Sequence, residues 1–373
     1  MTTAVLFTAT DHAHMARALR LAERGLYTTR PNPAVGCVLA HGGETVGEGW
    51  HERAGEAHAE VHALAAAGER ARGATAYVTL EPCATHGRTP PCVDALIAAG
   101  VARVVVACED RMQGEGEGLS RLRAAGIQVD VGLMSAAARD LNRGFFSRIE
   151  RGRPWLRIKL GTTLDGRTAL ADGRSKWITG AEARADVMRW RARSSALLTG
   201  SGTVRADDPS LTVRWEIPEA GDAPQPAFVP PLRVVLDNGL ATPAGSRLLD
   251  GSVPTLFIHA PDARNAAHFA QVDRVAVAEN DGRLDLQAAM AELARRGCNE
   301  VQVETGATLA GAFIAAGLCD ELLLYVAPRL LGHQARGLVN LPALAALDDA
   351  AHWHWHDVRT VGGDLRLLLR PPG

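Results

Sequence analysis

The sequence lacks the features of membrane-bound and secreted proteins. It contains no run of roughly eighteen consecutive apolar residues, which a transmembrane helix requires. Its first residues do not combine a basic segment with an apolar one, so no secretory signal is expected. Six cysteines in a chain of 373 residues do not make a disulfide framework. We therefore expect a cytoplasmic protein with no membrane partner.

The sequence also lacks an excess of charge of one sign, since its formal net charge is −2. Without a basic excess there is no electrostatic attraction to a polyanion, and this argues against a nucleic-acid partner. Aromatic residues are few, at 5%, but an apolar content of 47% is ample for globular folding. A chain of 373 residues exceeds one typical core, so two domains are expected.

One histidine and two cysteines form the most informative pattern that is present. His58 opens the segment His58-Ala59-Glu60, and Cys83 and Cys92 each follow a proline. One imidazole and two thiolates are ligands that Zn²⁺ prefers, and they leave the fourth tetrahedral position open to water. A structural zinc site normally closes with a fourth protein ligand, so three ligands favour a catalytic zinc.

Glu60 lies two residues beyond the proposed ligand His58. In zinc deaminases a glutamate of this kind is a general acid and base, and not a ligand. It would take the proton of the attacking water and deliver it to the ring nitrogen and the departing ammonia. This predicts hydrolytic deamination, but simpler interpretations stay open. His-x-Glu occurs often by chance, cytosolic cysteines are often small buried hydrophobes, and the zinc could be structural.

The predicted secondary structure brings these residues together. His58 begins an apolar periodic stretch that stops at Gly68, so it is expected in the first turn of a helix. Cys83 follows the β-prone segment 76–80, and Cys92 begins a helical run. Ligands at the C-terminal end of a strand and at two helix starts can converge at the top of an α/β sheet.

The first half alternates between helices and strands, which predicts a three-layer α/β domain that closes near residue 145. Helices are expected over 11–22, 58–68, 93–99 and 119–125. Strands are expected over 35–41, 45–49, 76–80, 101–107 and 127–131, and Gly42-Gly43 joins the first two in a hairpin.

A charged stretch with glycine, 148–153, is the expected linker to a second α/β domain. Strands are then expected over 156–160, 196–199, 232–236, 255–258, 301–303 and 321–326. Helices are expected over 181–193, 286–296 and 308–316. Segment 216–231, with five prolines, is a predicted surface loop, and Asp207-Asp208-Pro209 is a predicted helix or turn start.

Segment 303–309 carries the most chemical content of the second half. A strand runs into Gly306, and a helix start follows whose free backbone N–H groups can bind phosphate. The segment has neither a Gly-Lys-Ser/Thr ending nor the Gly-x-Gly-x-x-Gly dinucleotide pattern. An ordinary turn before a helix is the alternative.

Longer motifs extend over nearly the whole chain. They are Asn32-Pro33-x-Val35-Gly36, 55–64 around the His-x-Glu segment, Thr79-Leu80-Glu81-Pro82-Cys83, 86–92, Lys159-Leu160-Gly161, 163–167, 175–179, 207–214, Glu304-x-Gly306 and Ala327-Pro328. Together they resemble the bifunctional deaminase/reductase family of riboflavin biosynthesis. The eight-residue gap between Cys83 and Cys92 fits that family, whereas nucleic-acid and cytidine deaminases have Cys-x-x-Cys.

The resemblance implies two consecutive reactions. A cytidine-deaminase-like domain, residues 1–147, would remove the 2-amino group of a diaminopyrimidinone that carries a phosphoribosylamino substituent. A dihydrofolate-reductase-like α/β domain, residues 154–373, would then use NADPH to reduce the ribosyl group to ribityl. The expected partner is thus a small phosphorylated pyrimidine, and the protein is expected to form a homo-oligomer.

The resemblance also implies residue roles. Zinc would be held by His58, Cys83 and Cys92, with Glu60 as the catalytic proton shuttle. Asn32 and His51 would hold the pyrimidine. NADPH would contact Gly161, Trp177, Thr203, Asp207, Asn238, Gly306, Ala307, Thr308, Leu309, Ala310, Gly311 and Ala312. The reductase substrate would contact Ser175, Arg191, Leu211, Arg214 and Glu304, and the two arginines can fork onto phosphate oxygens.

One segment departs from the family pattern. Glu109-Asp110-Arg111-Met112-Gln113 stands where the family usually has Asp-Pro-Asn-Pro, near the pyrimidine pocket. Two other functions are therefore kept. One is a zinc deaminase of a related aminopyrimidine or purine whose C-terminal domain serves oligomerisation. The other is a non-enzymatic ligand-binding protein with structural zinc, against which Glu60 argues because a structural site does not need it.

Overall fold

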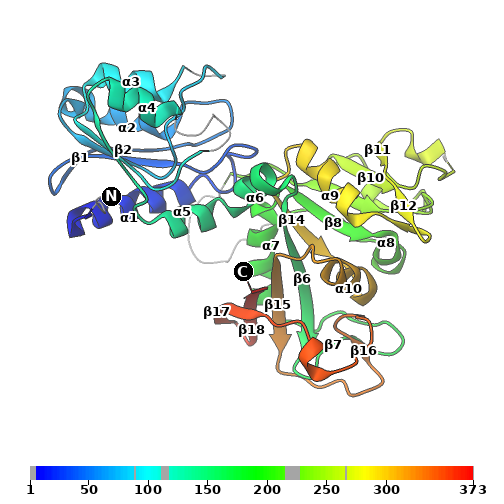
Figure 1. Ribbon diagram of the computed structural model, residues 1–373. Coiled ribbons are helices and arrows are strands. Elements are labelled where there is room, and N and C mark those ends of the chain that lie inside the picture. Colours follow the sequence, from blue (N-terminus) through cyan, green and yellow to red (C-terminus); the bar gives the residue numbers. More distant parts are fainter. Residues whose placement is uncertain (1–5, 88–89, 111–116, 215–226, 265–266, 373) are drawn as a thin grey trace. The chain divides into compact units, whose positions relative to one another are not determined.

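The computed structural model describes residues 6–87, 90–110, 117–214, 227–264 and 267–372. The chain divides into two compact units, Met1–Arg151 and Gly152–Gly373 (Figure 1). In the described residues, no helix is both long enough and apolar enough to cross a membrane.

The first unit is built on one five-stranded sheet of order β2-β1-β3-β4-β5. Its strands are β1 (Gly36–His41), β2 (Glu44–Trp50), β3 (Thr75–Val78), β4 (Arg103–Val106) and β5 (Gln128–Val131). Its helices are α1 (Ala9–Glu23), α2 (Ala59–Ala67), α3 (Cys92–Ala99), α4 (Glu117–Ala124), α5 (Ser135–Leu141) and α6 (Arg143–Arg151). Strand β1 is antiparallel to β2 and β3, whereas β3, β4 and β5 are parallel.

Helices cover both faces of this sheet, because β1, β3 and β4 carry apolar side chains on both sides. One core cluster joins the sheet to α2, α3 and α4, with Ala63, Val93 and Leu122 fully buried. A second cluster joins the other face to α1, α5 and α6, through residues such as Met15 and Phe146. The predicted three-layer arrangement is confirmed.

Two glycines of β2 allow α2 to lie unusually close to the sheet. A Cβ atom at Gly47 would come within 2.3 Å of the Ala63 carbonyl oxygen, and one at Gly49 within 2.4 Å of the Ala59 carbonyl oxygen. Any side chain at these positions would push α2 away from β2. This contact fixes the first turn of α2 against the sheet.

The second unit contains a nine-stranded sheet of order β11-β10-β9-β8-β14-β6-β15-β18-β17. Its strands are β6 (Trp155–Thr163), β8 (Ala196–Gly200), β9 (Leu232–Leu236), β10 (Thr255–His259), β11 (Asp273–Ala276), β14 (Glu300–Glu304), β15 (Glu321–Ala327), β17 (His354–Val361) and β18 (Asp364–Arg370). Short strands β7 (Arg167–Ala169) and β16 (Arg336–Gly337) pair with each other, as do β12 (Glu279–Asn280) and β13 (Arg283–Leu284). Among the described residues, the seven strands from β11 to β15 are parallel. Strand β18 runs antiparallel to β15, and β17 runs antiparallel to β18.

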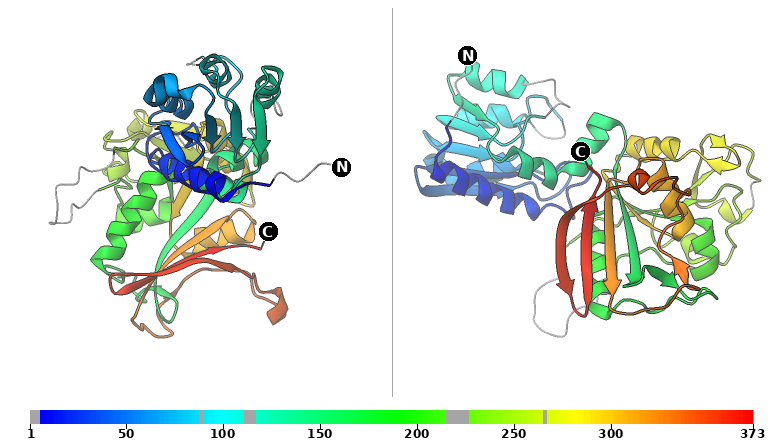
Figure 2. Two further views of the ribbon diagram at one scale, coloured as in Figure 1. Left: turned by 90° about the vertical axis from the view of Figure 1, so that its left-hand side faces the viewer. Right: turned by 60° about the horizontal axis from the view of Figure 1, so that its bottom comes forward.

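Four helices cover this second sheet: α7 (Ala181–Arg193), α8 (Ser201–Asp207), α9 (Leu286–Arg295) and α10 (Ala307–Ala315). The largest core cluster joins one face to α9 and α10 through Met290, Leu293 and Phe313. Smaller clusters join the other face to α7 and α8. Both units are therefore α/β folds with parallel strands, as the sequence predicted. Figure 2 shows the C-terminal hairpin (red) beside the orange strand β15.

Three local predictions need correction. The predicted linker 148–153 contains the division between the two units, but the chain is helical through Arg151, because α6 continues from the buried Phe145 and Phe146 to the at least partly exposed Arg148 and Arg151. Asp207-Asp208-Pro209 does not start a helix but ends α8, since Asp208 adopts a left-handed conformation with φ of 41°. His58 lies at the N-cap of α2, one residue before the turn in which it was expected.

We predict that the first unit folds on its own when the chain is cut after Gly152. Each unit has its own sheet and its own core, so neither needs the other to bury its apolar side chains. Circular dichroism of the fragment 1–152 should show one cooperative thermal transition. A fragment that stays insoluble at every boundary between 145 and 154 would contradict independent folding.

Candidate functional site

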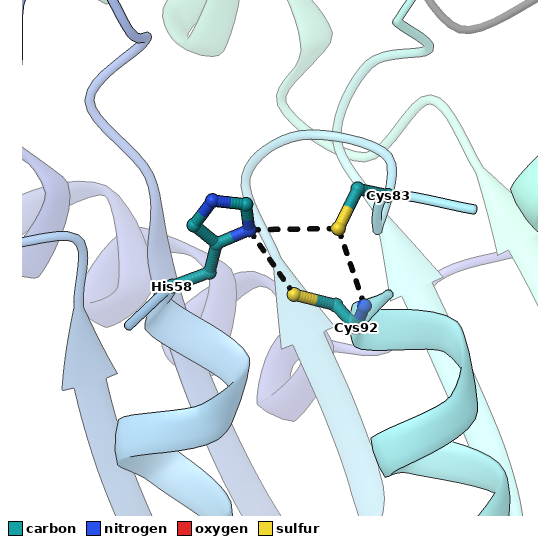
Figure 3. A group of neighbouring side chains, drawn as sticks. All are labelled: His58, Cys83 and Cys92. Carbon is teal, nitrogen blue, oxygen red and sulfur yellow. Dashed lines mark hydrogen bonds between the residues drawn. The ribbon is translucent and has the colours of Figure 1, made fainter. Parts of the chain in front are cut away.

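The predicted metal ligands converge in the first unit. His58 lies at the N-cap of α2, Cys83 in the loop after β3, and Cys92 at the first position of α3 (Figure 3). His58 Nδ1 lies 3.3 Å from Cys92 Sγ and 3.5 Å from Cys83 Sγ. Histidine, cysteine, aspartate and glutamate side chains can all bind metals. Within the described part of the chain, His58, Cys83 and Cys92 are the one group of three or more of these side chains whose ligand atoms all lie within 4.8 Å of one another.

These distances fit a zinc ion. Tetrahedral zinc with Zn–N near 2.0 Å and Zn–S near 2.3 Å places its nitrogen and sulfur ligands about 3.5 Å apart. The pKa of the Cys83 thiol also favours the thiolate form, which binds a cation. A hydrogen bond from Cys92 and a second from His58 lower the pKa of Cys83 to about 4, and the backbone N–H of Cys92 donates to its sulfur over 3.2 Å. The same pairing, together with burial, raises the pKa of Cys92, and a divalent cation would draw off its proton.

Glu60 lies in the first turn of α2 and is 3% exposed. Burial raises the pKa of its carboxyl group to about 7, and the side chain also hydrogen-bonds with Cys92. A carboxyl group with this pKa can both accept and release a proton near neutral pH. Glu60 thus lies beside Cys92, one of the three candidate ligands, and is not itself part of that group of three.

The two predicted pyrimidine-binding residues lie next to the metal centre. The ring of His51 packs edge-on against the ring of His58, with 5.2 Å between their centroids. His51 Nδ1 donates to the Ala57 carbonyl oxygen over 3.1 Å, so its Nε2 accepts from the Asn32 side-chain amide over 3.2 Å. Burial lowers the pKa of His51 and favours this neutral form. Asn32 is therefore oriented with its Oδ1 available as an acceptor.

In the second unit, Arg191 and Glu304 form a bidentate ion pair. Arg191 Nε and Nη2 each donate to a carboxylate oxygen of Glu304 over 2.7 Å, and Nη1 donates to the Thr212 carbonyl oxygen over 2.7 Å. Burial opposes ionisation of Glu304, but Arg191 and then Lys159 lower its pKa to about 2. The pKa of Lys159 is itself lowered by burial. Lys159 was not among the predicted site residues, although a lysine within the apolar segment 156–160 was a signal.

Other predicted residues follow the C-terminal ends of the parallel strands, where ligands bind in such sheets. Thr203, after β8, lies 3.5 Å from the Thr305 hydroxyl after β14. Leu309 of α10 lies against Gly200, where an added Cβ would be 3.1 Å from it. Asn238 follows β9 and donates to the Gly282 carbonyl oxygen, and its own Oδ1 is buried without a partner among the described residues.

Segment 306–312 divides into open and buried positions. Gly306 is the exposed N-cap of α10, and a Cβ there would meet nothing within 4 Å. Ala307, Thr308, Leu309 and Ala312 are also at least partly exposed. Ala310 and Gly311 are buried, and a Cβ at Gly311 would come within 1.9 Å of the Asn340 carbonyl oxygen. Gly311 is thus required by packing against the protein.

The remaining predicted residues lie on loops or near the ends of strand β6 and helix α8. Trp177 is 62% exposed, which sets it apart from a core tryptophan, and the Arg184 guanidinium lies 4.6 Å from its ring centre. Gly161 lies near the end of β6. A Cβ atom added at Gly161 would lie 3.5 Å from the Thr179 methyl group. Leu211 is buried with φ of 45°, Arg214 is exposed, Ser175 is partly exposed and Asp207 ends α8. In the described residues, no hydrogen bond or ion pair joins Ser175 or Arg214 to the Arg191–Glu304 pair.

The fold and the three-ligand centre with its adjoining glutamate define the class of the first unit, that of the zinc-dependent deaminases. Residues 8–108 match the cytidine and deoxycytidylate deaminase zinc-binding region, and residues 154–367 match the RibD C-terminal domain. The riboflavin biosynthesis protein RibD of Escherichia coli (strain K12) is 52% identical over 96% of this chain and 99% of its own length. That of Haemophilus influenzae is 47% identical over 98% of this chain and 99% of its length.

Solved structures agree over nearly the full chain. Acinetobacter baumannii RibD (form 1) has a TM-score of 0.88 and 40% identity, covering 98% of this chain and 99% of that one. The diaminohydroxyphosphoribosylaminopyrimidine deaminase/5-amino-6-(5-phosphoribosylamino)uracil reductase of Thermotoga maritima has a TM-score of 0.84 and 29% identity, covering 97% and 99%.

The chain belongs to the RibD family of riboflavin biosynthesis proteins. It is a bifunctional enzyme, a hydrolytic deaminase joined to a reductase, and its cofactors are Zn²⁺ and NADPH. The predicted family, fold class, activities and cofactors are confirmed. The alternative of a deaminase whose second domain serves only oligomerisation is not supported.

Proposed function

We propose that His58, Cys83 and Cys92 hold the zinc and that Glu60 transfers the protons of the deamination. Zinc, when bound, supplies a Lewis acid that makes water nucleophilic at neutral pH. Glu60 would take one proton from the attacking water and deliver it to the ring nitrogen, and would then move the proton of the added hydroxyl to the departing ammonia. The observation that carries this role is the burial of Glu60 beside Cys92, with its pKa raised to about 7.

We propose that the substrate is the diaminopyrimidinone with a phosphoribosylamino group, and that Asn32 and His51 orient its ring. The hydrogen bond from the Asn32 amide to His51 Nε2 leaves Asn32 Oδ1 to accept from a ring or exocyclic N–H. His51 is fixed in turn by its bond to Ala57 and acts by holding Asn32 in this orientation. Because Asn32 Oδ1 can only accept a hydrogen bond, it would bind a pyrimidine edge that presents an N–H and would not bind an edge that presents a carbonyl.

In the second unit we propose a division of roles between the two arginines. All three guanidinium nitrogens of Arg191 already donate, two of them to Glu304, so Arg191 orients that carboxylate for the sugar hydroxyls. Arg214 is exposed, and we assign it to the substrate phosphate. NADPH, when bound, supplies the hydride. The open backbone N–H groups of 306–309 would hold its pyrophosphate.

Glu60→Gln should keep about one zinc per chain and lose deaminase turnover by several orders of magnitude. The amide fills the same space beside Cys92 but cannot carry a proton between water and the ring. Zinc is counted by atomic absorption, and turnover is followed with the diaminopyrimidinone substrate. Near wild-type turnover would show that the proton shuttle is wrong, and loss of zinc would make Glu60 structural.

Gly306→Val should abolish NADPH-dependent reduction and leave zinc content and deamination unchanged. The added side chain meets nothing in the protein, so its effect falls on the bound pyrophosphate. Gly245→Val is the matched control, since this glycine is also exposed, open and without a positive φ. We also expect the wild type to prefer NADPH over NADH. Equal reduction rates with NADPH and NADH at matched low concentration would refute that preference. Equal loss of reduction in Gly306→Val and Gly245→Val would refute the pyrophosphate site.

We propose that the enzyme is a cytoplasmic homo-oligomer. None of the six cysteines, all of which lie in the described residues, forms a disulfide, which fits a reducing compartment. One face of the sheet formed by strands β15, β18 and β17 is apolar, and its outer part is exposed. The exposed fraction is 66% for Trp355, 53% for Val358 and 40% for Leu365. Their other face packs on α7 through Leu323, Tyr325 and Leu368. An exposed face of this apolar character is typical of homodimer interfaces.

Leu365→Glu should therefore convert the protein to a smaller oligomer or a monomer, because a carboxylate cannot be buried in such an interface. Light scattering after size exclusion measures the mass. Gln287→Glu adds the same charge at an exposed position of α9 and should leave the mass unchanged. Identical masses for the wild type and Leu365→Glu would exclude this face as the interface.

A further inference from the structure

Glu81 is a buried carboxylate that none of the proposed catalytic roles uses. It is 3% exposed and stands two residues before Cys83, between the end of β3 and the metal centre. Buried carboxylates need hydrogen-bond partners, so the contacts of Glu81 reveal what it holds in place.

Its two oxygens accept backbone N–H groups from two separate segments. Oε2 accepts from Asp110 over 3.1 Å, and Oε1 accepts from Gly118 over 3.1 Å and from Leu119 over 3.3 Å. Gly118 and Leu119 belong to the first turn of α4, whose N–H groups have no partner within the helix. Glu81 therefore joins the start of α4 and the chain after β4 to the residue pair that precedes Cys83.

Two further contacts bind α4 to the same loop. A Cβ at Gly118 would come within 2.4 Å of the Pro82 carbonyl oxygen, so the helix and the loop touch without an intervening side chain. From the next turn, Arg121 donates to the Ala84 carbonyl oxygen over 2.6 Å and pairs with Asp94 of α3. Loop residues on both sides of Cys83 are thus held by α4.

We propose that Glu81 is a positioning residue that fixes Cys83 in the geometry of the zinc centre by anchoring its loop to α4. The inference rests on the proposed role of Cys83 as a zinc ligand. It concerns the placement of Cys83 and assigns Glu81 no contact with metal or substrate. Partners that orient metal ligands typically change metal affinity or activity by about 10- to 100-fold when removed.

The contacts of Glu81 also bear on the segment in which the chain departs from its family. Asp110 precedes 111–116, which lie outside the described residues, and Gly118 follows them. Both are held through backbone N–H groups, which every residue except proline provides. Side chains of the departing segment can therefore change while the anchorage of Cys83 is kept.

The first test replaces Glu81 with Gln in the full-length enzyme and measures zinc affinity by competition with a chelator. The Gln amide places N–H donors opposite backbone N–H donors, so half of the anchorage is lost. We expect zinc to bind about 10-fold more weakly, deaminase kcat to recover when zinc is added in excess, and reductase kcat to stay unchanged. Asp130→Asn is the matched control, because it disturbs a buried acid of the same unit that pairs with Arg103 of β4 and hydrogen-bonds with neither the Cys83 loop nor α4.

A second variant reaches the same contact from α4. Gly118→Ala pushes the helix away from Pro82 without changing any charge and should weaken zinc binding in the same way, whereas Ser120→Ala on the exposed side of α4 should not. Wild-type zinc affinity in both Glu81→Gln and Gly118→Ala would overturn the proposal. The proposal would also be overturned if Asp130→Asn lost as much zinc affinity as Glu81→Gln while losing the same thermal stability. A wild-type enzyme that binds no zinc would instead overturn the proposed metal centre itself.

Discussion

The deaminase half depends on one constraint, the triangle of His58 Nδ1 with the sulfur atoms of Cys83 and Cys92. Each corner comes from a different element, and each element is held by backbone packing: α2 lies against the glycines of β2, and the Cys83 loop lies against α4. Glu60 follows from the same arrangement, because the turn that presents His58 also buries Glu60 beside Cys92. The proposed ligand and the proposed proton carrier thus share the start of one helix.

The reductase half uses the same architectural rule with different chemistry. Its candidate residues lie at the C-terminal ends of parallel strands, but they form an ion pair and an open helix N-terminus in place of a metal centre. NADPH, when bound, supplies the reactive hydride. The protein therefore needs to orient the cofactor and substrate and to neutralise their charge, and it does not need an acid–base pair like that of the first unit. The Arg191 guanidinium holds the pKa of Glu304 low, so this buried carboxylate stays ionised.

The sequence allowed the metal centre and both sheets to be predicted, because His-x-Glu, the spaced cysteines and the strand–helix alternation are local patterns. What it did not reveal depends on contacts between distant residues. The length of α6 was missed because its arginines resembled a linker, and its burial of Phe145 is visible only against the sheet. The roles of Glu81 and Gly311 were missed for the same reason, since their partners lie at Gly118 and Asn340.

X-ray absorption at the zinc edge of the purified enzyme tests the account most directly, because it reports the ligand set without assuming any activity. The account predicts two sulfur ligands at about 2.3 Å and two nitrogen or oxygen ligands at about 2.0–2.1 Å. One of the light ligands is the His58 nitrogen, and the other occupies the position open to water. A first shell with three or four sulfur atoms, or one with oxygen and nitrogen alone, would contradict a catalytic centre made of His58, Cys83 and Cys92.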